Sequence, residues 1–227
     1  MKVTWLGHSA FIIEEGGKKV LVDPFITGNE KAPVKPDDIE CDLIAVTHGH
    51  GDHLGDAIFI GKRKNVPIVA IYELAQYISS KGANGVGMNF GGTYEYEGIK
   101  LSMVPALHSS GITESNFAHD GGLPAGFVIE ISGKKVYHAG DTGLFGDMKL
   151  IGELYRPDVA LLPVGGLFTM DTKLATIAAK WINPKFVIPM HYNTWPPIEA
   201  NPEEMREELK KEGIELIVLK PGESFEF

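Results

Sequence analysis

The sequence concentrates metal-binding residue types in one short run. Its members are His48, His50, Asp52 and His53, and single glycines separate the first three. Neutral imidazole nitrogens and a carboxylate oxygen suit Zn²⁺, Mn²⁺, iron or Ni²⁺, and the glycines allow turns that aim alternate side chains at a cation. Because the run follows the apolar residues 43–46, chance clustering of histidines on a solvated loop is the less favoured interpretation. The spacing therefore predicts a metal site.

Three further candidate ligands each follow a short, strand-like apolar segment. They are His108, Asp141 and His191, after residues 99–107, 135–140 and 186–190 respectively. Buried strands that deliver polar residues at their carboxyl ends place those residues along one sheet edge, where α/β proteins assemble their sites. Seven ligands suit two cations if one carboxylate bridges them, and the glycine before Asp141 allows a close approach. We therefore expect a dinuclear centre of divalent transition-metal ions.

The order of these residues resembles the pattern of the metallo-β-lactamase superfamily. That pattern is His-x-His-x-Asp-His, a later His, an Asp in a Gly-Asp-Thr context and a final His, and it is matched between residues 48 and 191. The resemblance implies an α/β fold, a four-layer αββα sandwich with the metals at one edge of its two sheets. It also implies two ligand sets that share a bridging Asp141: His48, His50 and His108 for one cation, and Asp52, His53 and His191 for the other.

His8 is a candidate for a role at the same site. Its context, Trp-Leu-Gly-His-Ser-Ala-Phe, resembles the branch that contains L-ascorbate-6-phosphate lactonase-like proteins and N-acyl-phosphatidylethanolamine phospholipase D. We expect His8 to contact the substrate or to support a ligand, the alternative being a structural histidine. For His119, in the polar loop 115–122, and for His138, three residues before Asp141, the structural interpretation is favoured.

The expected chemistry is hydrolysis by a metal-activated hydroxide. Two adjacent cations lower the pKa of water and stabilise negative charge on a carbonyl or phosphoryl oxygen. Asp52 is expected both to bind the second cation and to orient the hydroxide. A small phosphodiester is the favoured substrate, because paired cations stabilise both the attacking and the leaving oxygen. The alternatives are a lactonase acting on a small anionic phosphorylated-sugar lactone and, in another class, a metal- or ligand-binding module without turnover.

Composition limits the partners and the compartment. The chain has 227 residues, of which 44% are hydrophobic and 22% charged, which suits one globular domain over residues 1–227. A net charge of −9 argues against a nucleic-acid surface and leaves a small anionic substrate as the expected partner. We find no secretory signal and no apolar stretch of membrane-spanning length, so we expect a cytoplasmic protein. The sequence is compatible with an oligomer, and the single cysteine, Cys41, is expected to be buried packing.

Alternating strand and helix signals predict the elements that position these residues. In the first half we expect a hairpin of residues 3–11 and 18–22, a strand at 67–71, a helix at 72–81 and a plain turn over the glycine-rich residues 82–92. In the second half we expect a hairpin of residues 127–131 and 135–138, a strand at 159–164 and a closing strand at 214–219.

Two helices have clear boundary signals. Asp171 is expected to cap a helix that buries one apolar face, formed by Leu174, Ile177, Ala178 and Trp181. Asn201 is expected to cap a second helix, which has Pro202 at its first position and ends before Gly213.

Overall fold

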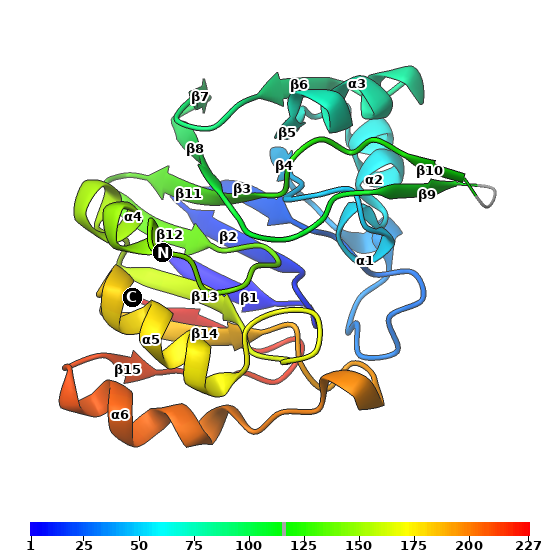
Figure 1. Cartoon of the computed structure of the whole chain (residues 1–227). Coiled ribbons are helices and arrows are strands. Elements are labelled where there is room, and N and C mark those ends of the chain that lie inside the picture. The colour runs from blue at the N-terminus through cyan, green and yellow to red at the C-terminus, as the bar shows by residue number, and fades with distance from the viewer. Residues whose placement is uncertain (115–116) are drawn as a thin grey trace.

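Two seven-stranded sheets pack face to face, with helices on both outer sides (Figure 1). The computed structural model describes residues 1–114 and 117–227. The predicted four-layer αββα sandwich is confirmed. The two chain ends meet at one end of the sandwich, where the amino group of Met1 donates to the carbonyl oxygen of Phe227 over 2.8 Å. Helix α1 (Gly51–Leu54) lies at the opposite end in Figure 1.

The first sheet combines an antiparallel and a parallel half. Its strands, in spatial order, are β16 (Ser224–Glu226), β1 (Lys2–Trp5), β2 (Phe11–Glu15), β3 (Lys18–Val22), β4 (Leu43–Ala45), β5 (Ile68–Ile71) and β6 (Gly85–Met88). The pairs from β16 to β3 are antiparallel and those from β3 to β6 are parallel. Strands β4 and β5 are buried along their whole length, which explains their continuous apolar sequences.

The second sheet has the same mixed design. Its strands, in spatial order, are β15 (Glu215–Leu216), β14 (Phe186–Met190), β13 (Val159–Pro163), β12 (Lys134–His138), β11 (Ala125–Ile131), β8 (Ile99–Pro105) and β7 (Thr93–Tyr96). The pairs from β12 to β15 are parallel, and those from β7 to β12 are antiparallel. A separate two-stranded ribbon pairs β9 (Ile112–Glu114) with β10 (Phe117–His119).

Helices cover the outer face of each sheet. Helices α2 (Ala57–Lys64) and α3 (Tyr72–Ser80) pack on the first sheet, and α4 (Met148–Tyr155), α5 (Thr172–Ile182) and α6 (Arg206–Lys211) lie along the second. Short 3₁₀ turns are found at Pro36–Asp38, Pro196–Ile198 and Pro202–Met205. Among the described residues, no helix has both the length and the apolar character needed to cross a bilayer.

The expected single strand over residues 3–11 is wrong. Strand β1 ends at Trp5 and β2 begins at Phe11, and between them the chain turns through Gly7 and His8, whose φ angles are 93° and 54°. Leu6 donates its backbone N–H to the carbonyl oxygen of Ala10 over 2.8 Å, which closes the turn. The apolar sequence pattern does not separate the turn from the strands, because the residues of this tight turn are as buried as those of the strands.

The glycine-rich residues 82–92 are not a plain turn, because they contain β6. A Cβ atom on Gly85 would lie 2.3 Å from the carbonyl oxygen of Ala75 in α3. Glycine is therefore present because the strand and the helix approach closely. This reason depends on a tertiary contact that local sequence does not reveal.

The apolar face assigned to α5 is also largely wrong. The Asp171 cap is present, since its carboxylate accepts the Leu174 N–H over 2.8 Å. However, Leu174 and Ile177 are exposed, and the buried positions include Ala175, Ala178, Ala179 and Ile182. Small residues face the core because α4 packs closely beside this helix.

The carboxyl-terminal segment differs in its details from the expectation. Asn201 caps the Pro202–Met205 turn, which leads into α6, so the helical region begins at the predicted cap. The predicted closing strand at 214–219 is shorter, because only β15 pairs with β14. The chain then crosses to the first sheet, where β16 forms its edge beside β1.

Gly85→Ala is expected to lower the free energy of unfolding by about 1–3 kcal/mol, the usual cost of overpacking a tight contact. Chemical denaturation measures this difference. Gly146→Ala is the matched control, since no atom lies within 4 Å of its added Cβ. Equal stability of the two variants would contradict the close strand–helix contact.

Candidate metal centre

The motif residues 48–53 form the turn between β4 and α1. His48 follows the buried end of β4, His50 is the N-cap of α1, and Asp52 and His53 lie in its first turn. Gly49 is required here, because a Cβ atom would lie 2.9 Å from the carbonyl oxygen of Ser110. The short helix thus presents its side chains toward the junction of the two sheets.

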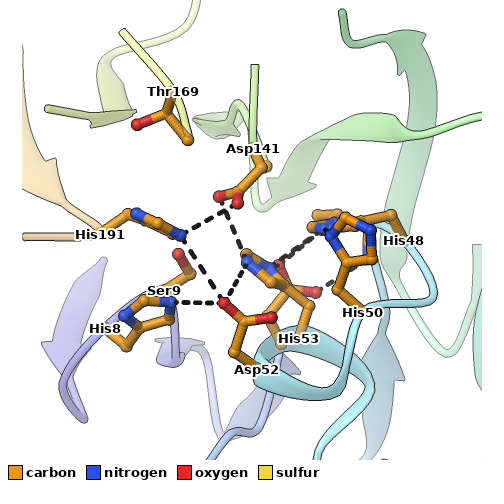
Figure 2. Close-up of polar contacts among 12 residues, drawn as sticks. His8, Ser9, His48, His50, Asp52, His53, Asp141, Thr169 and His191 are labelled. Carbon is orange, nitrogen blue, oxygen red and sulfur yellow. Dashed lines mark hydrogen bonds and ion pairs between the residues drawn. The ribbon is translucent and has the colours of Figure 1, made fainter. Parts of the chain in front are cut away.

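The other three candidate ligands come from the second sheet. His108, Asp141 and His191 follow β8, β12 and β14, which run in the same direction and end at the same edge. Gly140 has a φ of 63°, and its Cβ would lie 2.6 Å from the carbonyl oxygen of Ala125. This close turn brings Asp141 to the first sheet, and Figure 2 shows ligands from both halves of the chain converging.

All seven residues predicted as ligands lie together, with Asp141 between two groups. Its Oδ1 lies 3.2 Å from Nε2 of His53. Its Oδ2 lies 3.0 Å from Nε2 of His191 and 3.6 Å from Nε2 of His108. His48 and His50 approach within 3.0 Å through Nε2 and Nδ1.

Ligand atoms fall into three overlapping sets, each with all its atoms within 4.8 Å of one another. The sets are His48, His50 and His108; His48, His53 and Asp141; and His8, Asp52, His53 and His191. One end of the cluster is therefore made of three histidines, and the other combines histidines with a carboxylate.

The unpaired atoms of the cluster fit a bound cation. Nε2 of His53 and Oδ1 of Asp141 are buried without a hydrogen-bond partner in the structure, although they face each other. Nδ1 of His53 lies 2.7 Å from Oδ2 of Asp23, so this nitrogen carries a proton, and the neutral ring would offer the lone pair of Nε2 to a cation. Two electron-rich atoms at this distance require positive charge between them, and nitrogen with oxygen is a donor set that divalent transition metals accept.

The electrostatics of the cluster suit this interpretation. Burial lowers the pKa of His48 well below its usual value, and the neighbouring His53 adds to the effect, so His48 is neutral, as a ligand must be. Burial opposes protonation of His53 too, but Asp141 and Asp23 together raise its pKa well above the usual range. A metal ion would replace the proton that these carboxylates otherwise hold on His53.

Asp23 is a functional residue that the sequence reasoning missed. It follows β3, is fully buried, and has a φ of 45°. Besides contacting His53, Oδ2 accepts the Thr47 hydroxyl over 2.7 Å and Oδ1 accepts the Thr47 N–H over 2.8 Å. These bonds orient the His53 ring. The available signal was a carboxylate directly after an apolar strand, the same signal that identified Asp141.

His8 lies beside the carboxylate end of the cluster. Nε2 lies 3.1 Å from Oδ2 of Asp52, and Nδ1 lies 2.8 Å from the Thr194 hydroxyl. Burial lowers the pKa of His8 to about 4, although its hydrogen bond with Asp52 acts in the opposite direction. Its carbonyl oxygen accepts the backbone N–H of His191 over 3.0 Å. Both histidines have left-handed backbones, with φ of 54° and 55°, and such strain is common at functional sites.

The remaining histidines and the cysteine lie outside the cluster. His119 lies on β10, where its Nε2 is 4.0 Å from Glu114; residues 115–116 of the expected loop fall outside the described residues. His138 is fully buried and bonds the carbonyl oxygen of Ser9 over 2.9 Å, which links the two sheets. Cys41 is partly buried against the core, and this burial raises the pKa of its thiol to about 12.

Sequence comparison identifies close relatives. A profile of the β-lactamase superfamily domain matches residues 2–191. A UPF0173 metal-dependent hydrolase of Methanosarcina mazei is 56% identical over 227 residues, which cover 100% of this chain and 98% of that protein. Another, from Archaeoglobus fulgidus, is 53% identical over 230 residues, which cover 100% and 99%.

Solved structures agree with these matches. Igni18, a metallo hydrolase from Ignicoccus hospitalis, has a TM-score of 0.90 at 42% identity, covering 100% of this chain and 98% of that one. A hydrolase of the metallo-β-lactamase superfamily from Thermotoga maritima has a TM-score of 0.59 at 25% identity, covering 96% and 97%. The chain therefore belongs to the metallo-β-lactamase superfamily and, within it, to the UPF0173 metal-dependent hydrolases.

Proposed function

We propose that this metal-dependent hydrolase binds two divalent cations and hydrolyses a small phosphodiester. The observation that carries the proposal is the position of Asp141, whose two carboxylate oxygens face different histidines of one cluster. A buried carboxylate is unfavourable unless positive charge lies beside it, and metal ions would supply that charge where the histidines bind as neutral ligands. Seven ligand atoms exceed the four that one tetrahedral ion binds, which supports two cations.

The distances are compatible with the two ligand sets that the family resemblance implies. We assign His48, His50 and His108 to one cation, and Asp52, His53 and His191 to the other, with Asp141 bridging them. The first three offer atoms within 4.8 Å of one another. Nε2 of His191 and Nε2 of His53 lie 3.8 and 3.9 Å from Oδ2 of Asp52, separations that one shared cation between them can span. The donor set accepts Zn²⁺, Mn²⁺, Ni²⁺ or iron.

The protein's own groups then orient the reaction. Two cations held by these residues would supply acidified water and electrostatic stabilisation of the attacking and leaving oxygens of a phosphodiester. Every hydrogen bond and ion pair that the described residues make with Asp52 uses Oδ2. Its Oδ1 is therefore available to accept a hydrogen bond from the attacking water and to aim it.

His8 supports Asp52 and is the second residue of this arrangement. If the Thr194 hydroxyl donates to Nδ1, the His8 proton is on Nε2 and points at Asp52. This bond keeps the Asp52 carboxylate in one orientation, so that Oδ1 stays aimed at the attacking water. We therefore assign His8 a positioning role, with no metal bound to it.

Metal-loaded protein is expected to contain two transition-metal ions per chain. Elemental analysis after exhaustive dialysis measures the ratio, and bis(p-nitrophenyl) phosphate and a simple lactone serve as substrates for the same preparation. A stable limit of one ion per chain would contradict the bridging assignment. Faster turnover of the lactone would favour the lactonase alternative over the phosphodiesterase.

Asp141→Asn is expected to lower metal affinity and turnover by roughly 100-fold or more, because partners outside the ligand shell already contribute about 10–100-fold. The substitution keeps the side-chain shape and removes the charge. Cys41→Ala is the matched control, since this thiol lies outside the cluster. Full metal content and full turnover in folded Asp141→Asn would mean that the assignment is wrong.

His8→Ala is expected to leave two ions bound while turnover falls about 10–100-fold, the range for a residue that orients a metal ligand. Thermal unfolding and metal content are measured on the same samples. The opposite pattern, lower thermal stability with unchanged kinetics, would show that His8 is structural. Thr194→Val should reproduce part of the kinetic loss and shift the pH profile, because it removes the partner of Nδ1.

A further inference from the structure

Four large apolar side chains are exposed beside the candidate metal centre. Leu107, Leu167, Phe168 and Trp195 are 60%, 68%, 55% and 37% exposed; we call them the apolar rim. Each exposes surface that water solvates poorly, and a cluster of such side chains usually marks a binding site. The backbone contacts of the rim determine where it lies relative to the metal ligands.

Leu107 is attached to the turn that carries Asp141. It directly precedes His108, its N–H donates to the Thr142 hydroxyl over 2.9 Å, and its carbonyl oxygen accepts the Gly143 N–H over 2.9 Å. The Leu107 side chain therefore lies beside two candidate ligands on one flank of the centre.

Leu167 and Phe168 lie on the loop between β13 and α5. The loop is held against the Asp141 turn, because Met170 donates its N–H to the carbonyl oxygen of Thr142 over 3.1 Å. At its start, a Cβ atom on Gly165 would lie 2.3 Å from the carbonyl oxygen of His191. Figure 2 shows the next loop residue, Thr169, beside Asp141 and His191. This part of the rim therefore lies next to both ligands.

Trp195 occupies a third flank. The centroid of its indole ring lies 4.8 Å from that of His8 and 5.9 Å from that of Phe25. Because His8 bonds Asp52, the indole lies next to the carboxylate end of the cluster. The rim residues thus approach the centre from three separate segments of the chain.

The charged side chains around the centre support the same conclusion. Among the described residues, every ion pair that involves a candidate ligand joins a histidine to an aspartate, and none involves lysine or arginine. A phosphorylated sugar carries an additional dianionic group, which proteins usually hold with arginine or lysine. Lys31 and Lys220 line a cavity beside His8, but neither pairs with a candidate ligand, so apolar groups rather than cationic side chains lie next to the ligand cluster itself.

We propose that the substrate is a phosphodiester with a bulky apolar group that the rim binds while the ester reaches the cations. This inference rests on the proposed function. It replaces the phosphorylated-sugar lactone by an amphiphile: a single reacting anionic group with an alkyl or aryl substituent. Burial of that substituent against the rim supplies the binding energy that positions the ester.

The test uses two series of probes on the metal-loaded full-length chain. Turnover is measured with p-nitrophenyl methyl, butyl and octyl phosphates, and binding is measured by calorimetry with methyl-, butyl- and octylphosphonate. We expect kcat/KM and affinity to rise with length by up to about fourfold per buried methylene, which corresponds to about 0.8 kcal/mol.

Matched variants separate the rim from general surface hydrophobicity. The double substitution Leu167→Ser and Phe168→Ser is expected to weaken the dependence of kcat/KM and of affinity on alkyl length. Both quantities should fall far more for the octyl compounds than for the methyl ones. Leu150→Ser with Leu154→Ser is the control, because these leucines are similarly exposed but lie on α4. This control is expected to keep the length dependence.

The outcomes distinguish the two proposals. Turnover and binding that do not depend on the length of the alkyl group would contradict the proposed role of the apolar rim, even if the methyl ester is hydrolysed. Length-dependent phosphonate binding without hydrolysis of any phosphodiester would support the rim and contradict the phosphodiesterase. A dimer that becomes monomeric in the double variant, with no change in length dependence, would show that a second copy covers the rim, and would overturn the proposal.

Discussion

The structure depends on burying the Asp141 carboxylate where the two sheets meet. Removing a carboxylate from water costs several kcal/mol unless opposite charge or hydrogen bonds compensate. Here His53 and His191 hold the pKa of Asp141 well below its usual value, although burial acts in the opposite direction. Asp23 faces the other nitrogen of His53, so the buried carboxylates of Asp23 and Asp141 contact the same imidazole ring. The arrangement requires positive charge at the cluster, and bound metal ions would supply it.

The backbone around the cluster is shaped by the same requirement. Gly49 and Gly140 permit approaches that a Cβ atom would block, and His8 and His191 have left-handed φ angles. Such conformations are unfavourable for histidine and persist only where surrounding contacts hold them. The bond from the His191 N–H to the His8 carbonyl oxygen connects these two turns. The edge where the ligands converge therefore carries backbone strain, although Glu97, Ser132 and Arg156 have positive φ angles elsewhere in the fold.

Polar and apolar groups have separate roles at this edge. The interior of the site consists of imidazoles and carboxylates that hold charge, whereas the apolar rim surrounds it with side chains that carry none. Such a division suits a hydrolase that obtains orientation from its ligands and binding energy from the remote part of its substrate. The exposed Leu174 and Ile177 of α5 lie on a separate element, so surface hydrophobicity in this chain is not restricted to the site.

The sequence by itself determined the types and order of the candidate ligands, because a metal-binding motif is a local pattern, and its resemblance to a known superfamily implied the sandwich architecture. Only the tertiary structure decided the turn at His8, the strand β6 and the role of Asp23. Each depends on a partner distant in the chain: Asp23 acts through His53, 30 residues away, and Gly85 is explained by α3. Which residues of α5 are buried also depends on the tertiary structure, because this helix packs beside α4. A local pattern records which residues are apolar or polar, but the fold alone selects the neighbours they contact.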